Sequence, residues 1–115
     1  MAQILGRGDI IFLSNDPKPD DVSEQKGDRP WLVVSEKLVN RTSPFVLAVP
    51  FTNTVREYPL VYDWDKEQHG SKTQGTLLCN QITALDVRRR PWSYIEHVEI
   101  PVEVDNIIQA MLGYK

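Results

Sequence analysis

The sequence predicts a small, mainly β domain with a C-terminal helix, folded as a strongly bent sheet or SH3-like barrel. Short runs rich in Val, Ile, Leu and Phe alternate with Pro, Gly, Asn and Asp, which is typical of short strands. Only one segment, near the C-terminus, has a helical hydrophobic period. The length of 115 residues fits one domain, which we take as 1–115.

Six strands are expected, at 9–14, 31–35, 45–51, 60–64, 76–82 and 94–100. Pro30 stands just before the second strand, where a proline is tolerated, and Pro50 indicates an edge or a bulge in the third. Residues 15–28 contain two prolines, a glycine and many charged side chains, which predicts a long solvated loop. Loops of this length without structure of their own are often functional.

The last element is a helix of about three turns over 104–112. Its apolar residues recur at the helical spacing of i, i+3, i+4, i+7 and i+8, at Val104, Ile107, Ile108, Met111 and Leu112. Pro101 stands where a first turn tolerates proline, and Gly113 stands where a helix end favours glycine. A broad apolar stripe on this helix, with Phe45 and Trp31, exceeds what one small core uses, which predicts a homodimer.

Charge and cysteine content limit the classes of protein. Thirteen Lys and Arg against 16 Asp and Glu give a formal net charge of −3, so any nucleic-acid role depends on a local patch. One cysteine, Cys79, forms neither an intrachain disulfide nor a cysteine-based zinc site. No apolar run approaches the about 20 residues of a membrane span, and the N-terminus lacks a signal peptide's apolar stretch. We therefore expect a cytoplasmic protein without a membrane segment.

Several kinds of chemistry have no motif in the chain. There is no glycine-rich phosphate-binding loop, and two histidines with one cysteine give no metal-ligand spacing, so no cofactor or metal is expected. A ribonuclease using His69 and His97 is an alternative, but a surface-loop histidine and a half-exposed strand histidine are favoured. Cys79 follows two leucines and is expected in the core. The arginines at 88–90 suit a solvated turn better than a phosphate site.

Four segments carry a family resemblance. They are R-G-D-I-I from residue 7, S-E-Q-K-G-D-R-P from 23, V-P-F-T-N from 49 with Y-P-L from 58, and L-L-C-N-Q-I from 77 with A-L-D from 84. In this order and spacing the segments resemble the MazF/PemK family of toxin endoribonucleases, over nearly the whole chain. The loop from residue 23 together with the threonine-ended strand is the specific part, since R-G-D alone is weak.

The resemblance implies a dimeric CcdB/MazF-like toxin fold that cuts single-stranded RNA without a metal. In that chemistry the 2′-hydroxyl attacks the adjacent phosphate and leaves a 2′,3′-cyclic phosphate and a 5′-hydroxyl. Arg29 and Thr52 match the family's catalytic arginine and threonine. The resemblance also implies a cognate MazE-like antitoxin, whose acidic and apolar tail covers the RNA groove.

The residue types fit this reaction. A pentavalent phosphorane gains negative charge, which a fixed guanidinium such as that of Arg29 stabilises. The Thr52 hydroxyl can bond a non-bridging oxygen. The proton acceptor stays open, because an arginine pKa above about 12 leaves the choice between a strongly perturbed Arg29 and another group such as Glu24.

Further residues match positions that border the RNA groove in the family. They are Ser23, Glu24, Gln25, Asn53, Arg56, Asn80 and Gln81. Gln81 fits a structural role as well as RNA contact, because a buried amide must be hydrogen-bonded.

The chain also departs from the family. Val22 replaces a usual glycine, and Leu78 and Asn80 replace an arginine and an aspartate of some relatives, so the base sequence that is cut cannot be carried over. Two other readings remain open, a CcdB-like gyrase poison and a non-catalytic SH3-like binding module.

Overall fold

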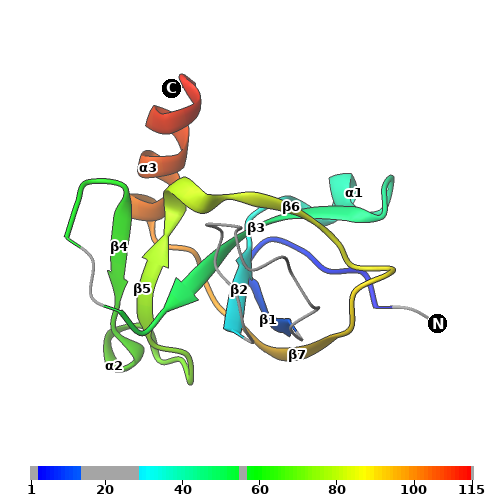
Figure 1. Cartoon of the computed structure of the whole chain (residues 1–115), viewed down its shortest axis with the longest axis horizontal. Helices are drawn as coiled ribbons and strands as arrows, with labels where there is room; N and C mark the ends of the chain where they lie inside the picture. Colours follow the sequence, from blue (N-terminus) through cyan, green and yellow to red (C-terminus); the bar gives the residue numbers. More distant parts are fainter. Residues whose placement is uncertain (1–2, 14–28, 55–56, 115) are drawn as a thin grey trace, which may run out of the picture.

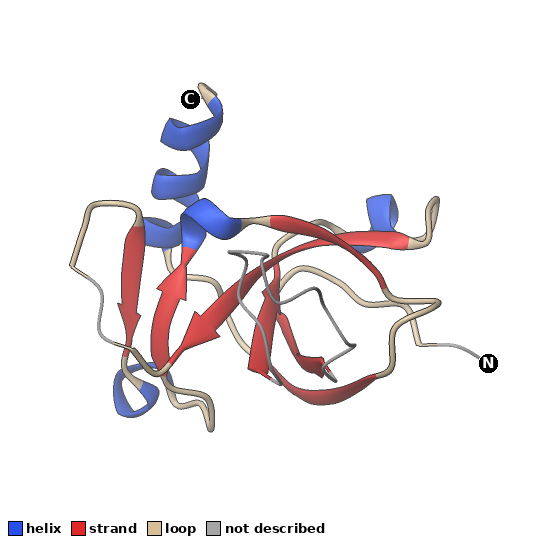
Figure 2. Ribbon diagram, viewed as in Figure 1, coloured by secondary structure: helices blue, strands red, loops and turns tan. Residues whose placement is uncertain are grey.

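The computed structural model describes residues 3–13, 29–54 and 57–114, which form a bent antiparallel sheet with one long helix (Figure 1). The strands are ordered β4-β5-β3-β2-β1-β7, with β6 paired to β3 off this path. Their bounds are β1 Asp9–Leu13, β2 Arg29–Val33, β3 Phe45–Thr52, β4 Val61–Trp64, β5 Gly75–Leu78, β6 Thr83–Asp86 and β7 Trp92–His97. Figure 2 shows the strands forming the body of the fold, with the helices at its periphery. The expected mainly β class is confirmed, as an open bent sheet rather than a closed barrel in the part of the chain described.

Strand β3 holds the sheet together because it changes partner along its length. Its residues 48–50 pair with β2, residues 45–48 pair with β6, and residues 51 and 52 pair with β5. Pro50 lies between the β3 residues that pair with β6 and those that pair with β5. On this edge of β3 no partner strand needs a backbone N–H from residue 50, so proline is tolerated there. The prediction of an edge strand is therefore wrong, while the interrupted pairing that proline signals is present.

Other differences from the expected elements have local causes. β2 begins at Arg29, so Pro30 lies inside it, paired with Phe12 of β1 but before the first β3 pair at Trp31. The strand expected over 76–82 ends at Leu78, because the chain turns into the 3-10 helix η1, Cys79–Gln81. β6 and the four-residue helices α1, Lys37–Asn40, and α2, Lys66–His69, were not predicted, since elements this short leave little periodicity.

Alternation along the strands divides the core into two clusters. Ile10 and Leu32 belong to the larger cluster, whereas Ile11 and Trp31 belong to the smaller one on the other face. Trp31 is only 7% exposed, so the expectation that it offers surface for a dimer is wrong.

The expected C-terminal helix is present as α3, Val102–Leu112, two residues longer at its start than predicted, and it packs on the larger cluster. Val104 is fully buried, and Gly113 ends the helix at φ 82°, in the left-handed region that favours glycine. Arg7 forms an ion pair with Asp105, which ties the start of β1 to α3. None of the described helices is long and apolar enough to cross a membrane.

Candidate functional site

The pairing of β2 with β3 brings Arg29 and Thr52 together. Trp31 lies opposite Pro50, and continuing this antiparallel register by two residues places Arg29 opposite Thr52. Opposed residues project from the same face of a sheet, and here the face is that of the smaller cluster. Two residues 23 positions apart in the chain thus stand side by side where the apolar face ends.

The guanidinium of Arg29 is hydrogen-bonded to the backbone of β3. Its Nη1 donates to the carbonyl oxygen of Phe51 at 3.2 Å, so the guanidinium is anchored to the strand that carries Thr52. The side chain is partly buried, and burial lowers the pKa of Arg29 from its ordinary value. A cation fixed in this way gives up little reorganisation energy when an anion arrives.

Thr52 is 7% exposed at the end of β3. Its Oγ1 accepts a hydrogen bond from the backbone N–H of Thr54 at 3.2 Å. Because that bond uses an oxygen lone pair, the hydroxyl hydrogen remains able to donate to a ligand.

The neighbouring strand supports Thr52 through a close backbone approach. Gly75 has φ +147°, and a Cβ built there would lie 2.8 Å from the carbonyl oxygen of Thr52. This position therefore requires glycine, because any side chain would push β5 away from the end of β3.

A cavity of about 410 Å³ opens over the pair, lined by Phe12, Arg29, Pro30, Phe51, Thr52, Asn53, Thr54 and Gln74. Arg29 is the one titratable residue among these lining residues. A second cavity of about 390 Å³ adjoins it and shares Asn53 and Gln74, so two amide side chains form a common wall. Asn53 was predicted at the site, whereas Gln74 was missed because it lies in a connection without any sequence pattern.

The other predicted site residues fall elsewhere. Asn80 and Gln81 lie in η1 and line neither of the two cavities, although Asn80 is exposed and its Oδ1 accepts a hydrogen bond from the Tyr58 hydroxyl at 3.1 Å. Gln81 is partly buried, and its backbone carbonyl accepts a hydrogen bond from the Thr83 hydroxyl at 2.7 Å. Ser23, Glu24, Gln25 and Arg56 lie outside the described residues.

The two histidines have separate partners. His97 Nδ1 lies 2.8 Å from Asp9 Oδ1, whereas His69 Nε2 lies 2.8 Å from the Tyr62 hydroxyl. The ring of His69 also stacks on Trp64 at 4.3 Å between centroids, so it is not a free loop histidine. Neither histidine lines the cavity over Arg29 and Thr52.

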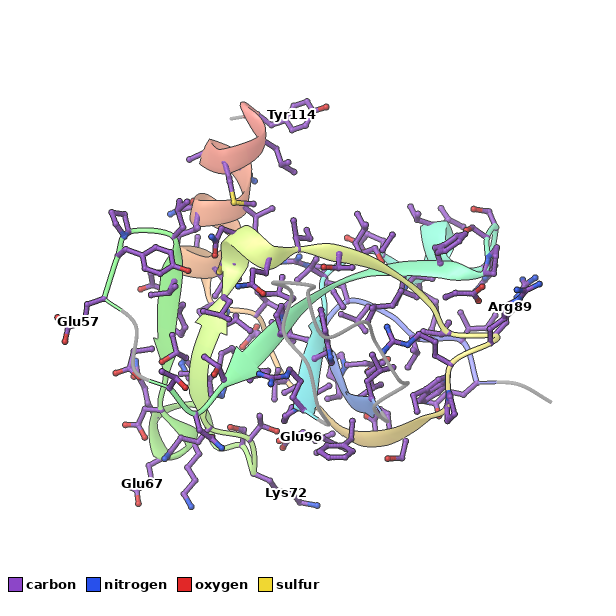
Figure 3. All side chains as sticks on the ribbon, viewed as in Figure 1. Glu57, Glu67, Lys72, Arg89, Glu96 and Tyr114 are labelled. Carbon is purple, nitrogen blue, oxygen red and sulfur yellow. The ribbon has the colours of Figure 1, made fainter. Side chains whose placement is uncertain are left out.

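Cys79 lies in the core, and Arg88 and Arg89 lie on the surface, away from the cavity over Arg29 and Thr52. Cys79 is fully buried, and burial raises the pKa of its thiol to about 11, as expected of a core cysteine. Arg88 and Arg89 are exposed in a turn whose backbone is held by Asp86, and Figure 3 shows Arg89 at the molecule's periphery. In the described part of the chain, no three His, Cys, Asp or Glu side chains gather as metal ligands.

Comparison with known proteins extends over the whole fold. The family model for the PemK-like, MazF-like toxin of type II toxin–antitoxin systems matches residues 6–112. The chain is 31% identical over 114 residues to endoribonuclease EndoA of Bacillus subtilis strain 168, covering 96% of both chains. It is 26% identical to endoribonuclease MazF of Staphylococcus epidermidis, covering 96% of this chain and 92% of the relative.

Solved structures agree in fold. A MazE–MazF crystal structure from Deinococcus radiodurans superposes with a TM-score of 0.80 at 22% identity, covering 98% of this chain and all of that one. An endoribonuclease bound to its cognate antitoxin from a mycobacterial species gives 0.72 at 23% identity, covering 96% and 97% of the two chains. At these identities the likeness shows the fold alone.

Proposed function

The chain belongs to the family of PemK-like, MazF-like toxins of type II toxin–antitoxin systems, and from this premise we propose that it is an endoribonuclease. The substrate is single-stranded RNA in the cytoplasm, and the cut is made beside Arg29 and Thr52. One observation carries the proposal: a half-buried arginine, anchored to the Phe51 carbonyl, and a buried threonine line the same open cavity just beyond the last β2–β3 pair. That is the residue pair needed to hold a phosphate while it gains charge.

The reaction proceeds by attack of the ribose 2′-hydroxyl on the adjacent phosphorus, with departure of the 5′-oxygen of the next nucleotide. The 2′-hydroxyl loses its proton as the new P–O bond forms, and the departing 5′-oxygen gains a proton as the old P–O bond breaks. Arg29 faces the developing phosphorane and offers forked N–H donors to its non-bridging oxygens. Thr52 donates its hydroxyl hydrogen to one of these oxygens, since its own oxygen accepts from Thr54. The products are a 2′,3′-cyclic phosphate and a 5′-hydroxyl.

None of the described residues that line the cavity is proposed as the acceptor of the 2′-hydroxyl proton. Arg29 is the titratable residue among the described lining residues, and burial lowers its pKa. Its role in this mechanism is charge stabilisation, because an arginine stays protonated at neutral pH even after a moderate shift. Glu24, the other candidate acceptor, lies outside the described residues.

The test is incubation of the pure protein with a long single-stranded RNA in EDTA. Cleavage that leaves cyclic phosphate and 5′-hydroxyl ends supports the proposal. Intact RNA together with inhibition of gyrase would instead indicate the CcdB-like function, and intact RNA with no gyrase effect would indicate a non-catalytic binding module. The Arg29–Thr52 cavity is the observation that favours cleavage over both.

We also propose that the active form is a homodimer. Large apolar side chains remain exposed on two elements, with Phe45 and Leu47 on β3 and Val102, Leu112 and Tyr114 on or beside α3. Apolar area of this kind is stabilised when a partner covers it. Sedimentation at micromolar concentration should give about twice the chain mass of 13.2 kDa. A single species at the monomer mass would contradict the dimer.

A cognate antitoxin is the proposed inhibitor. The two structures described above contain such a pair, a MazE–MazF complex and an endoribonuclease with its cognate antitoxin. An acidic, apolar antitoxin segment lying over Arg29 would compete with phosphate for the same cation, and its electrostatic part would weaken with salt. Titration of such a peptide should displace labelled RNA. Simultaneous binding of peptide and uncleavable RNA at full affinity would place inhibition elsewhere.

A further inference from the structure

Gln74 occupies an unusual position beside the proposed catalytic pair. It lines the cavity over Arg29 and Thr52 and also the adjoining one, and its side chain is exposed. Within the described part of the chain, its amide makes no hydrogen bond to protein. An amide carries both donors and an acceptor, so it can bond the edge of a nucleic-acid base.

The segment that carries Gln74 is held on one side by Glu96 of β7. The Glu96 carboxylate accepts from the backbone N–H groups of Lys72 at 3.0 Å and Thr73 at 2.9 Å. It also accepts from the Thr73 hydroxyl at 2.7 Å. Figure 3 labels Glu96 and Lys72 on this lower side of the molecule. Thr73, the residue before Gln74, is therefore fixed through both its backbone and its side chain, and it is 6% exposed.

The same segment is fixed at two further points. Trp64 Nε1 donates to Ser71 Oγ at 2.9 Å, and Ser71 Oγ donates to the Thr73 carbonyl at 2.8 Å. On the other side of Gln74, Gly75 starts β5 against the Thr52 carbonyl. The backbone of Gln74 is thus bracketed by fixed residues, while its side chain is left to project into the two cavities. A polar side chain on a fixed backbone, with its amide left unbonded by the described residues, is available to bind a ligand.

The charges that line the two cavities indicate which part of a nucleotide lies against Gln74. The adjoining cavity is lined by Asp63 and Asp65, whose carboxylates repel a phosphate group. The positively charged residue, Arg29, lines the other cavity, beyond the amide side chains of Asn53 and Gln74. The scissile phosphate is therefore expected to bind in the cavity lined by Arg29, and the neighbouring base is expected to lie beside the amides of Asn53 and Gln74.

We propose that Gln74 is a specificity-determining residue that hydrogen-bonds the base next to the cleaved phosphate, and that Glu96 is the positioning residue that holds it there. This inference rests on the proposed endoribonuclease function, because it needs RNA phosphate at Arg29. It assigns a role to a connection that contains none of the four segments on which the family resemblance rests.

The first experiment compares Gln74→Ala with Gln68→Ala. Gln68 is also an exposed glutamine, in α2 of the same connection, but it lines a different cavity. The substrate is a short RNA that spans the main site mapped on a long mixed-sequence RNA. Loss of one base contact should lower kcat/KM roughly 3- to 10-fold, chiefly through KM, and should reduce discrimination between bases at that position. Gln68→Ala should stay within twofold of the wild type. Unchanged kcat/KM and unchanged base preference in Gln74→Ala would overturn the assignment.

The second experiment asks whether Glu96 acts through Gln74. Glu96→Gln places an N–H group against the donors of Lys72 and Thr73. It should therefore raise KM as much as Gln74→Ala does. The double variant Gln74→Ala/Glu96→Gln should be no worse than Gln74→Ala alone. Effects that multiply would refute the positioning role. If Glu96→Gln does not fold, Thr73→Val removes only the 2.7 Å hydroxyl bond and takes its place in the same cycle.

Failure of the inference is distinguishable from failure of the proposed function. If the wild type cuts RNA, Arg29→Ala does not, and Gln74→Ala equals the wild type, then the function stands and the inference falls. If the wild type does not cut RNA, the proposed function falls. Anisotropy with a 2′-O-methyl RNA then measures binding, and equal affinity of wild type and Gln74→Ala would remove the base contact as well.

Discussion

Replacing Arg29 by alanine tests the centre of the proposed mechanism. The variant loses the cation that faces the phosphorane, while Thr52 and the cavity remain. Removing one preorganised transition-state donor lowers a rate by roughly 100- to 1000-fold, which corresponds to about 3–4 kcal/mol. Arg29→Lys keeps the charge but loses the forked donors, so its defect should be smaller than that of alanine.

The structure also limits the effect of this change on stability. Arg29 is the first residue of β2 rather than a loop residue, and truncation removes its bond to the Phe51 carbonyl. Such a bond contributes roughly 0.5–1.5 kcal/mol, and leaving the carbonyl of the buried Phe51 without this donor costs at most about 3 kcal/mol. A domain with about 5–15 kcal/mol of stability remains folded after this loss.

The assay is single-turnover cleavage of a labelled RNA in EDTA, with circular dichroism to verify folding. The wild type, Arg29→Lys and Arg29→Ala should rank in that order. An alanine variant that is folded and cuts within threefold of the wild type would show that Arg29 is not the catalytic cation.

Three further predictions concern the support of the site. Thr52→Ala should slow cleavage by a smaller factor than Arg29→Ala with an unchanged circular dichroism spectrum, whereas Thr52→Ser, which keeps the hydroxyl, should stay close to wild type. Gly75→Ala should lower the melting temperature by more than Gly70→Ala, because both glycines have positive φ but only at Gly75 would the Cβ meet backbone, 2.8 Å from the Thr52 carbonyl; equal shifts would refute the close approach. Partial burial alone would raise the pKa of Glu96, but the hydrogen bonds from Lys72 and Thr73 outweigh it and lower that pKa below 4.5. The stabilisation is therefore present above pH 4.5 and lost as pH falls through the lowered pKa, so the melting-temperature gap between wild type and Glu96→Gln should narrow in acid.

The sequence predicted the parts of the fold that have strong periodicity. The apolar runs gave β1 and β3 closely, and the 3.6-residue spacing with Pro101 and Gly113 gave α3. It did not predict that β3 takes three partners, because pairing between distant segments leaves no local signal. For the same reason Pro50 predicted an edge or a bulge rather than a change of partner.

The site could be predicted only in part. Arg29 and Thr52 were found through the family resemblance, and the structure explains their proximity by a register that sequence spacing does not reveal. Gln74 and Glu96 were missed because the roles proposed for them depend on bonds between Glu96 of β7 and residues 23 and 24 positions earlier. The R-G-D segment, in contrast, is structural: Gly8 has φ +99° against β7, and Asp9 accepts from the Gly6 N–H.

The partner changes of β3 affect the order in which the molecule can be completed during translation. A ribosome delivers residues from the N-terminus onward, so β2 and β3 emerge before β5 exists. Thr52 obtains its backbone support only when Gly75 arrives, and β1 receives its second neighbour only when β7 arrives at residues 92–97. A nascent chain thus carries Arg29 and Thr52 for some time without the strands that hold them in place. The backbone support of the proposed catalytic pair is therefore complete only after residues 75–97 have been synthesised.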